Sequence, residues 1–408
     1  MRKLSIGILK EGKIPVDRRV PLTPLQAEQV VARFPGVKVL CQSSPVRCFI
    51  DEEYTDVGIS VAEEVNGCDI LIGVKEVPIK ELIAGKTYFF FSHTIKKQAY
   101  NRKLLQAIIL KKIRLIDYEC LTDKNGSRLI AFGRYAGIVG AYNGLLAFGL
   151  KHNLYDLRRV RDCFDLKDLK TEFSKVILPP TKIVLTGGGR VANGAKEVLE
   201  GMQIAYVSPK DFIAKNFNHA VYTQLRSKDY HFRNEDGGFD AEEFYKNPEK
   251  YQTDFLRYTK QADLLIAAAY WNPKAPVLFT KTDMQKADFK ISVIADISCD
   301  IEGSIPSTKR PSTIDDPVYD YNPWEDKVEL PYSGRKFISV MAVDNLPCEL
   351  PRDASREFGQ EMINKILPCV INDDPDNIIG RATIAEDGHL TENYKYLQSY
   401  IEEGKNIL

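Results

Sequence analysis

The first 135 residues alternate between short apolar runs and longer stretches of helical pattern. The apolar runs have the length of buried strands. Strands that alternate with helices predict βαβ units and a mostly parallel sheet. We expect strands at residues 4–9, 37–40, 69–74, 88–91 and 114–118, and helices at residues 23–34 and 97–110.

A second α/β pattern begins after the polar stretch that ends at Pro179-Pro180. A glycine-spotted apolar helix at 135–152 comes before it and is suited to crossing between two domains. Residues 209–262 are polar and rich in aromatics, and this insert is too long for a simple crossover. The other elements we expect are strands at 182–185, 204–207, 264–269, 290–297 and 337–343, and helices at 190–201, 351–368 and 394–401.

The composition and net charge of the chain limit the classes of function that we expect. The 408 residues include 56 basic and 56 acidic side chains, 44% apolar and 27% charged residues, as in a soluble globular protein of two or three domains. A formal charge of zero gives no electrostatic reason to expect nucleic acid or an anionic membrane as the main partner. The N-terminal apolar stretch is interrupted by charge too early for a signal peptide, so we expect a cytoplasmic protein. The eight cysteines and five histidines are scattered, so we expect reduced thiols and no metal.

The strongest local motif follows the strand expected at 182–185. Gly187 permits a tight turn, Gly189 lets the backbone approach a pyrophosphate, and the N-terminus of the next helix favours negative charge. Ala192 stands where the third, close-packing glycine is usual. We therefore expect this loop to bind a dinucleotide through Gly187, Gly188, Gly189, Arg190 and Val191.

The type of dinucleotide depends on the end of the next strand. Counting 21 residues on from Gly187 leads to Ser208, with Lys210 close by and no carboxylate before Asp211. A carboxylate at this position would bind a ribose diol and repel a 2′-phosphate. The sequence therefore favours NADP, with Ser208 and Lys210 at the ribose, and NAD is the alternative if Asp211 is the ribose ligand.

Polar residues also follow two strands of the first half. Lys75 and Glu76 end the strand at 69–74, and His93 follows the strand at 88–91. Residues just beyond the carboxyl ends of parallel strands face the crevice where open α/β sheets bind ligands. Each of these residues alone is as consistent with a solvated pair or a cap, and their joint arrangement is the informative feature.

That arrangement resembles the alanine dehydrogenase and saccharopine dehydrogenase superfamily. The chain is most similar to the lysine–2-oxoglutarate reductase half of α-aminoadipic semialdehyde synthase. The motifs that carry the resemblance are RVPLTP at 19–24, KE at 75–76, FFSHTIK at 90–96, RLIDYE at 114–119, the aromatic segment 245–251, ADISCD at 295–300, GSI at 303–305, VDNLP at 343–347 and YKY at 394–396.

The resemblance implies a fold and a reaction. It implies two Rossmann-like doubly wound domains with an interdomain cleft, and a discontinuous substrate domain of residues 1–140 and 347–408 around a dinucleotide-binding domain of residues 141–346. The implied reaction condenses L-lysine with 2-oxoglutarate and reduces the imine to saccharopine with hydride from the nicotinamide. The oligomeric state stays open.

The resemblance also implies residue roles. Lys75 and His93 would be the acid/base pair, with His93 serving the carbonyl and water steps and Lys75 the amine nitrogen. Arg19, Lys96 and Arg128 would bind carboxylates or set the charge of the site, although Arg18 beside Arg19 leaves open which guanidinium reaches the substrate. Glu76 and Glu119 would tune the pair and receive an ammonium, and Asp300 would lie beside the nicotinamide.

Other functions remain open from the sequence. One is the NAD-dependent saccharopine dehydrogenase that runs the same chemistry toward lysine. Another is an alanine dehydrogenase, which would need a site for one carboxylate. The non-enzymatic alternative is a nucleotide-binding regulatory protein, which would have no need of the Lys75 and His93 pair.

Overall fold

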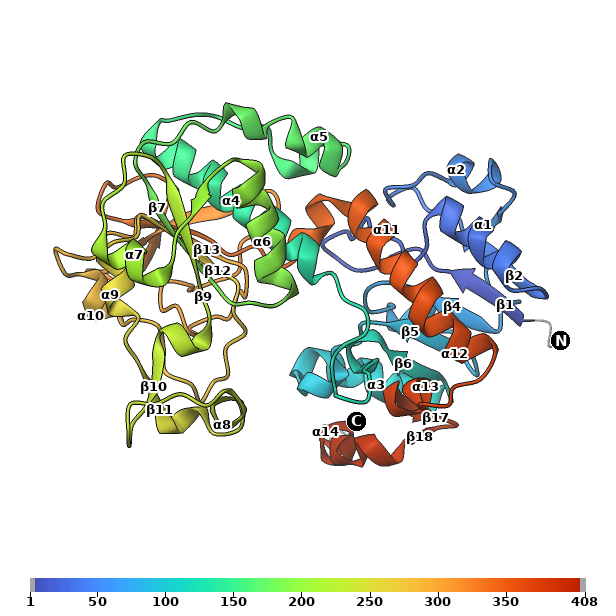
Figure 1. Ribbon diagram of the computed structural model, residues 1–408. Helices are drawn as coiled ribbons and strands as arrows, with labels where there is room; N and C mark the ends of the chain where they lie inside the picture. Colours follow the sequence, from blue (N-terminus) through green and yellow to red (C-terminus); the bar gives the residue numbers. More distant parts are fainter. Residues whose placement is uncertain (1–3, 404–408) are drawn as a thin grey trace. The chain divides into compact units, whose positions relative to one another are not determined.

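The structure is a computed structural model that describes residues 4–403. The chain divides into two compact units, with boundaries after Ala131 and after Leu350. The first unit combines the chain before Phe132 with the chain from Pro351 onward, and the second unit is the stretch between them. Within the described residues, each unit is built on its own mostly parallel sheet (Figure 1). The predicted α/β class is confirmed.

The sheet of the first unit has the strand order β18-β17-β6-β5-β4-β1-β2-β3. Strands β1 to β6 run parallel, and the C-terminal strands β17 and β18 add an antiparallel edge beside β6. The bounds are β1 Leu4–Ile8, β2 Val37–Gln42, β3 Ser60–Ala62, β4 Ile70–Ile72, β5 Thr87–Phe90, β6 Arg114–Asp117, β17 Thr383–Glu386 and β18 His389–Leu390.

Capping hydrogen bonds and prolines account for where two helices of the first unit begin and are interrupted. Helix α1 starts at Pro24, and the side chain of Gln26 accepts a hydrogen bond from the backbone N–H of Thr23. The long helix expected at 351–368 is interrupted by a π-helical stretch just before Pro368, because proline has no N–H for the helix ladder. The bounds are α1 Pro24–Arg33, α2 Asp51–Thr55, α3 Arg102–Leu110, α11 Pro351–Glu361, the π-helix Met362–Ile366, α12 Leu367–Ile371, α13 Ile378–Ala382 and α14 Gln398–Glu402.

The sheet of the second unit has the strand order β15-β14-β16-β13-β12-β7-β9-β8. Strands β8, β9, β7, β12, β13 and β16 are parallel, and the hairpin β14–β15 forms an antiparallel edge. The bounds are β7 Lys182–Thr186, β8 Ala205–Tyr206, β9 Val221–Leu225, β12 Leu264–Ala267, β13 Val293–Asp296, β14 Val318–Asn322, β15 Lys327–Glu329 and β16 Ile338–Met341.

Helices α4 and α6 of the second unit cross at very short range, side by side in Figure 1. A Cβ atom on Gly137 would lie 1.8 Å from the carbonyl oxygen of Val191, and one on Gly194 would lie 2.0 Å from that of Arg134. The glycines are therefore what lets the two backbones touch. The bounds are α4 Gly133–His152, α5 Leu166–Lys170, α6 Arg190–Gly201, α7 Pro209–Ala214, α8 Ala241–Lys246, α9 Leu256–Thr259 and α10 Lys281–Met284.

The two compact units divide the chain at other positions than the predicted domain boundaries at 140/141 and 346/347. Helix α4 packs along its whole length in the second unit, so it is not divided at residue 140. The turn Leu346–Glu349 joins it there, because Asn143 of α4 donates a 2.9 Å hydrogen bond to the buried carboxylate of Glu349.

The predicted insert at 209–262 contains regular structure that the sequence pattern did not show. Strand β9 lies inside the sheet, between β7 and the edge strand β8. The rest of the insert extends from the end of β9 as a small hairpin, β10 His231–Arg233 and β11 Tyr251–Thr253, with α8 between its strands (Figure 1). None of the helices in residues 4–403 has the length and hydropathy needed to cross a membrane.

Candidate functional site

Strands β4, β5 and β6 lie side by side in the first unit and run in the same direction. Lys75 and Glu76 follow β4, His93 follows β5, and Glu119 follows β6. Parallel sheets bind ligands outside the carboxyl ends of their strands. The fold therefore brings these four predicted site residues to the same edge of one sheet.

His93 and Glu76 are directly hydrogen-bonded. The distance from His93 Nδ1 to Glu76 Oε1 is 2.6 Å, and the second carboxylate oxygen of Glu76 accepts a 2.8 Å bond from Lys13 Nζ. Burial alone would raise the pKa of Glu76, but the bonds from His93 and Lys13 outweigh it and lower the pKa to about 2. Glu76 is therefore ionised at any working pH and holds the imidazole in a fixed orientation, with Nε2 left for other contacts.

Lys75 occupies an environment that disfavours its charge. Burial, followed by the positive charges of Arg19 and Lys13, lowers the pKa of Lys75 below its usual range. Its ammonium makes no hydrogen bond or ion pair with the part of the chain that the structure describes. The backbone N–H of Lys75 donates a 2.8 Å bond to the carboxylate of Glu11, so the main chain at this position is fixed while the side-chain nitrogen stays available.

Three residues that the sequence interpretation did not use surround Lys75. Lys13 bonds Glu76, Glu11 also accepts a 2.6 Å bond from the N–H of Val74, and burial followed by the nearby charge of Asp17 raises the pKa of Glu11 to about 8. Asp17 forms a two-bond ion pair with Arg19. Glu11 lies a few residues after the end of strand β1. The criterion that identified Lys75, a polar residue just beyond the end of a parallel strand, could therefore have identified Glu11 as well.

The structure distinguishes the two arginines. Arg19 is buried, with 3% of its side chain exposed, and its guanidinium pairs with Asp17. Arg18 is exposed. Arg19 is therefore the arginine that lies near Lys75, and its positive charge helps to lower the pKa of Lys75.

Glu119 lies between two cations at the end of β6. Its Oε1 accepts a 2.9 Å bond from Arg128 Nη2 and lies 3.8 Å from Lys96 Nζ. Its Oε2 is buried and has no hydrogen-bond partner in residues 4–403. The buried carboxylate of Asp117 anchors the loop by accepting a 2.7 Å bond from the N–H of Glu119. An oriented carboxylate oxygen with open capacity is suited to an ammonium or amine.

In the second unit, the glycine loop has the geometry of a phosphate cradle. Gly187 has φ +97°, and a Cβ atom there would lie 2.7 Å from the carbonyl oxygen of Ala268, so only glycine fits. A Cβ on Gly189 would have nothing within 4 Å, which leaves open space in front of the N-terminus of the twelve-residue helix α6. The backbone is thus open to an anion at the end of a helix where negative charge is favoured.

A pocket opens in front of this loop. Its walls include five of the residues predicted to bind the cofactor, together with Arg226 and Ser227, Tyr245, and the segment after β12. The predicted residues among its walls are Gly187, Gly188, Gly189, Arg190 and Val191.

The two residues predicted at the ribose, Ser208 and Lys210, lie outside the lining of this pocket. Ser208 and Lys210 follow β8, but β8 is an edge strand and β9 separates it from β7. The side chain of Ser208 caps helix α7 by accepting a 3.1 Å bond from the N–H of Asp211, and neither Ser208 nor Lys210 lines the pocket. The 21-residue count failed because the strand beside β7 is not the next strand in the sequence.

The strand that does lie beside β7 is β9, and it is followed directly by Arg226, a residue that the sequence interpretation missed. A Cβ on Gly188 would lie 3.3 Å from Arg226 Nε, so the guanidinium side chain lies over the glycine loop. The carboxylate of Asp229 in the same loop accepts a 2.7 Å bond from the N–H of Arg226. The residue that follows the carboxyl end of β9, the strand beside β7, is therefore the positively charged Arg226.

The structure also places two further predicted positions, Ala192 and Asp300. Ala192 is fully buried, but the close contact expected at the third glycine position is made by Gly194 against α4. Asp300 lies exposed in the loop after β13, close to Gly303. Within residues 4–403, no three His, Cys, Asp or Glu side chains are grouped closely enough to hold a metal ion.

Comparison with protein families matches both parts of the chain. Residues 7–139 match the N-terminal domain of the alanine dehydrogenase/PNT family, and residues 169–396 match its C-terminal domain. The chain belongs to this family. Among solved structures, an L-alanine dehydrogenase superposes with a TM-score of 0.64 over 98% of this chain and 100% of its own, at 18% identity. A transhydrogenase from Sinorhizobium meliloti superposes with a TM-score of 0.54 over 95% of this chain and 98% of its own, at 12% identity. These two likenesses bear on the fold.

Curated relatives of this alanine dehydrogenase/PNT family member include enzymes of two lengths. The mitochondrial α-aminoadipic semialdehyde synthase of Mus musculus is 31% identical over 99% of this chain and 49% of its own length. The saccharopine dehydrogenase [NAD(+), L-lysine-forming] of Yarrowia lipolytica is 26% identical over 86% of this chain and 89% of its own length. The chain thus spans about half the length of the synthases it matches.

Proposed function

We propose that the chain is a lysine–2-oxoglutarate reductase, an NAD(P)-dependent oxidoreductase that forms saccharopine. The reaction joins the ε-amine of L-lysine to the keto carbon of 2-oxoglutarate, loses water and reduces the resulting imine. The observation that carries the proposal is the cluster of Lys75, Glu76 and His93 at one sheet edge, beside Glu119 with its two cations. The similarity to α-aminoadipic semialdehyde synthase supports the choice of substrates.

His93 is assigned the proton transfers at oxygen. With Nδ1 held by the ionised Glu76 at 2.6 Å, Nε2 is the nitrogen left to protonate the departing hydroxyl of the condensation intermediate.

Lys75 is assigned the proton transfers at nitrogen. Burial and the charges of Arg19 and Lys13 lower the pKa of Lys75, so its ammonium gives up a proton more readily than an exposed lysine does. A neutral amine accepts a proton from the substrate ammonium, which must be deprotonated before it attacks a carbonyl carbon. The same group returns a proton to the secondary amine of the product.

The charged groups at the end of β6 match the charges of the substrates. Glu119 Oε2 is the open acceptor for an ammonium, and Arg128 and Lys96 are half-exposed cations that suit the carboxylates of 2-oxoglutarate. This arrangement favours a substrate with more than one carboxylate, such as 2-oxoglutarate, over pyruvate.

A nicotinamide dinucleotide, when bound, would supply the hydride. In this chain the glycine loop would hold its pyrophosphate, and Arg226 at the end of β9 would lie where the ribose 2′ substituent is recognised. A guanidinium there suits a 2′-phosphate. We therefore propose NADP as the cofactor, now on Arg226 in place of Ser208 and Lys210.

One observation favours a second candidate, the NAD-dependent saccharopine dehydrogenase that forms lysine. The Yarrowia lipolytica enzyme of that name is covered over 89% of its length, so the two chains are of comparable extent. Both candidates share the acid/base cluster and differ in the cofactor.

Steady-state kinetics test the proposal. Purified protein is assayed with L-lysine and 2-oxoglutarate, and separately with ammonia and pyruvate, using NADPH and NADH in each case. We expect turnover with lysine and 2-oxoglutarate and a preference for NADPH. A preference for NADH would identify the second candidate, turnover with ammonia and pyruvate would identify an alanine dehydrogenase, and nucleotide binding without turnover of either pair would indicate a regulatory protein.

A matched pair of histidine variants tests the site. His93→Gln should lower the turnover number by about 10²–10⁴-fold, the usual effect of losing a positioned acid or base, with little change in cofactor affinity. His389→Gln is the control, because His389 is exposed on β18 of the same unit. Equal turnover of the two variants would contradict the role of His93.

A further inference from the structure

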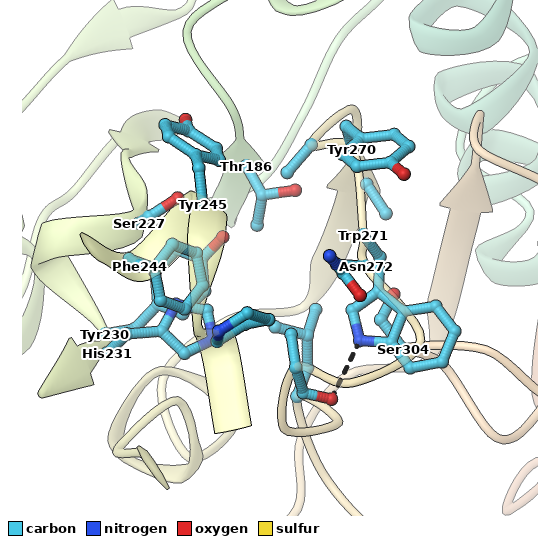
Figure 2. Close-up of a pocket in the computed structure, with 15 residues that line it drawn as sticks. Thr186, Ser227, Tyr230, His231, Phe244, Tyr245, Tyr270, Trp271, Asn272 and Ser304 are labelled. Atoms are coloured by element: carbon cyan, nitrogen blue, oxygen red, sulfur yellow. Dashed lines mark hydrogen bonds between the residues drawn. The ribbon is translucent and has the colours of Figure 1, made fainter. Parts of the chain in front are cut away.

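A pocket beside helix α4 in the second unit has no role in the proposed chemistry. The second half of α4 forms one wall, the loop that follows this helix forms another, and residues at the start of β14 and after β15 complete the lining. The pocket shares no lining residue with the pocket in front of the glycine loop, or with the aromatic pocket beside Tyr245 and Tyr270 in Figure 2. A ligand bound beside α4 would therefore occupy a separate site.

Much of the lining of this pocket is apolar. It includes the buried side chains of Leu146 and Ala147 on α4, Leu157 in the loop and Val318 at the start of β14. Leu150, near the end of α4, is 37% exposed and adds an apolar side chain that water reaches. A ligand with an aliphatic or aromatic group would remove part of this surface from water, which is favourable.

Arg159 brings an unpaired positive charge to the same lining. Its guanidinium donates to the carbonyl oxygens of Ile314 and Asp315, and it forms no ion pair with the part of the chain that the structure describes. Arg158 also lines the pocket, but its guanidinium pairs with the carboxylate of Asp168 at 2.6 Å. The two carbonyl bonds hold the Arg159 side chain in place and leave other N–H groups unused, an arrangement that suits a carboxylate.

The hydroxyl of Tyr332 is a second donor for a carboxylate. It has no hydrogen-bond partner among residues 4–403, and the charge of Arg159 acts on its pKa, so the two groups lie within electrostatic range of each other. Burial, followed by the charge of Asp320, raises the pKa of Tyr332 to about 12 although Arg159 lowers it, so the phenol keeps its proton near neutral pH. The residue has φ +59°, in the left-handed region that bulky side chains rarely adopt.

Asp156 and Asn143 bring acceptors to the lining. Asp156 is exposed and has no ion-pair partner within residues 4–403, whereas the other two aspartates of the lining pair with neighbouring arginines. The side-chain amide of Asn143 donates from Nδ2 to Glu349, and its Oδ1 accepts no bond from the described chain. Arg159 and Asp156 are thus the two lining charges without an ion-pair partner there, one of each sign.

We propose that this pocket binds a zwitterionic α-amino acid with an apolar side chain. The carboxylate binds to Arg159 and Tyr332, the ammonium to Asp156 and Asn143, and the side chain lies against the apolar lining beside Leu146. A ligand with a single charge would leave Arg159 or Asp156 unpaired. The lining belongs to the second unit, whereas the catalytic cluster of Lys75, Glu76 and His93 belongs to the first, so the bound amino acid has no part in the proposed reaction.

Isothermal titration calorimetry with four probes tests the ligand class. L-leucine and L-phenylalanine carry both charges, isocaproate is leucine without its amino group, and isoamylamine is leucine without its carboxyl group. We expect saturable binding of at least one of the two amino acids, and binding of each leucine analogue that is weaker than that of leucine by about ten- to a hundredfold, the effect of losing a hydrogen-bonded charge. Equal binding of leucine and isocaproate, or no binding of either amino acid at millimolar concentrations, would overturn the proposal.

Matched variants test the residues. Arg159→Gln and Tyr332→Phe should each lower the affinity for the amino acid by about ten- to a hundredfold. Arg161→Gln is the control, because Arg161 is exposed, lies two positions from Arg159 and does not line the pocket, and it should leave the affinity unchanged. Should Arg159→Gln fail to fold for want of its two carbonyl bonds, Tyr332→Phe decides, since it keeps the ring and removes the hydroxyl alone. Wild-type affinity in Tyr332→Phe would overturn the assignment.

A third variant separates this pocket from the catalytic cluster, which is proposed to bind lysine. Arg128→Gln changes a cation of that cluster and should leave the affinity for leucine or phenylalanine unchanged. Affinity that is lost in Arg128→Gln and retained in Arg159→Gln would overturn the proposal, because the amino acid would then bind at the cluster. Sedimentation velocity gives the remaining outcome: a wild-type dimer that dissociates in Arg159→Gln, without binding of any probe, would show that a second copy of the chain covers the pocket and would also overturn it.

Discussion

Replacing Lys75 by methionine should change activity and stability in opposite directions. The variant removes the amine that is assigned the proton transfers at nitrogen, so the turnover number should fall by about 10²–10⁴-fold. Methionine has a similar length and no branch at Cβ, so it fills the same space. The loss of turnover should therefore come from chemistry, with cofactor affinity nearly unchanged.

The stability gain follows from the environment of the side chain. The side chain of Lys75 is partly buried, and its ammonium has no hydrogen bond or ion pair within residues 4–403 and lies near the like charges of Arg19 and Lys13. An unpaired polar group in such a place costs about 1–3 kcal/mol. Lys75→Met should raise the free energy of unfolding by about that amount near neutral pH.

The gain should depend on pH with a definite sign. The pKa of Lys75 is lowered from 10.5 in the folded chain, so the folded state binds this proton less well than the unfolded state does. The penalty is fully present below the folded pKa and disappears as the pH approaches 10.5. The stability difference between Lys75→Met and the wild type should therefore be largest at neutral and acidic pH and shrink in alkali.

Urea unfolding followed by circular dichroism over a range of pH, together with cofactor oxidation rates, measures both effects. Lys103→Met is the control, because Lys103 is exposed on helix α3 of the same unit, and it should change neither quantity. A Lys75→Met protein that is less stable than the wild type and retains its turnover would refute the reasoning. Lys75 would then be a structural residue.

Three other substitutions, the first of them with a matched control, test separate parts of the structure. Arg226→Ala should reduce the preference for NADPH over NADH in kcat/KM by roughly ten- to a hundredfold, whereas Lys210→Ala should leave the ratio unchanged, and equal effects would contradict the strand assignment. Glu119→Gln should lower kcat/KM for lysine by roughly ten- to a hundredfold and affect 2-oxoglutarate much less, and an unchanged value for lysine would rule out Oε2 as the amine acceptor. Gly194→Ala should lower the free energy of unfolding by about 1–3 kcal/mol, because its Cβ would lie 2.0 Å from the carbonyl oxygen of Arg134, and an unaltered urea midpoint would show that the helices can separate freely.

The strands of the first unit, and the polar residues that follow them at one edge of the sheet, could be predicted from the sequence. Apolar runs marked β4, β5 and β6, and in a parallel sheet their carboxyl ends share an edge, so Lys75, Glu76 and His93 could be expected together. The bond between Glu76 and His93 and the bidentate pair of Arg19 with Asp17 were not predictable, because they depend on where loops bring side chains.

The order of the strands in the second unit could not be predicted from the sequence. Strand β9 has a polar side chain near its end, Gln224, which donates a 3.0 Å bond to the carbonyl oxygen of Gly187 and so supports the glycine loop. That polar residue interrupts the apolar run by which a buried strand is recognised. With β9 overlooked, counting along the chain led to Ser208 instead of Arg226.

The central claim is that this chain joins lysine to 2-oxoglutarate, and the product of a labelled reaction tests it most directly. L-lysine carrying nitrogen-15 at its side-chain nitrogen is incubated with 2-oxoglutarate and NADPH that carries deuterium at the transferred position. Mass spectrometry should find saccharopine that contains both the nitrogen-15 and one deuterium. Lysine recovered without conversion, or a deuterated amino acid product that lacks the nitrogen-15, would contradict the claim.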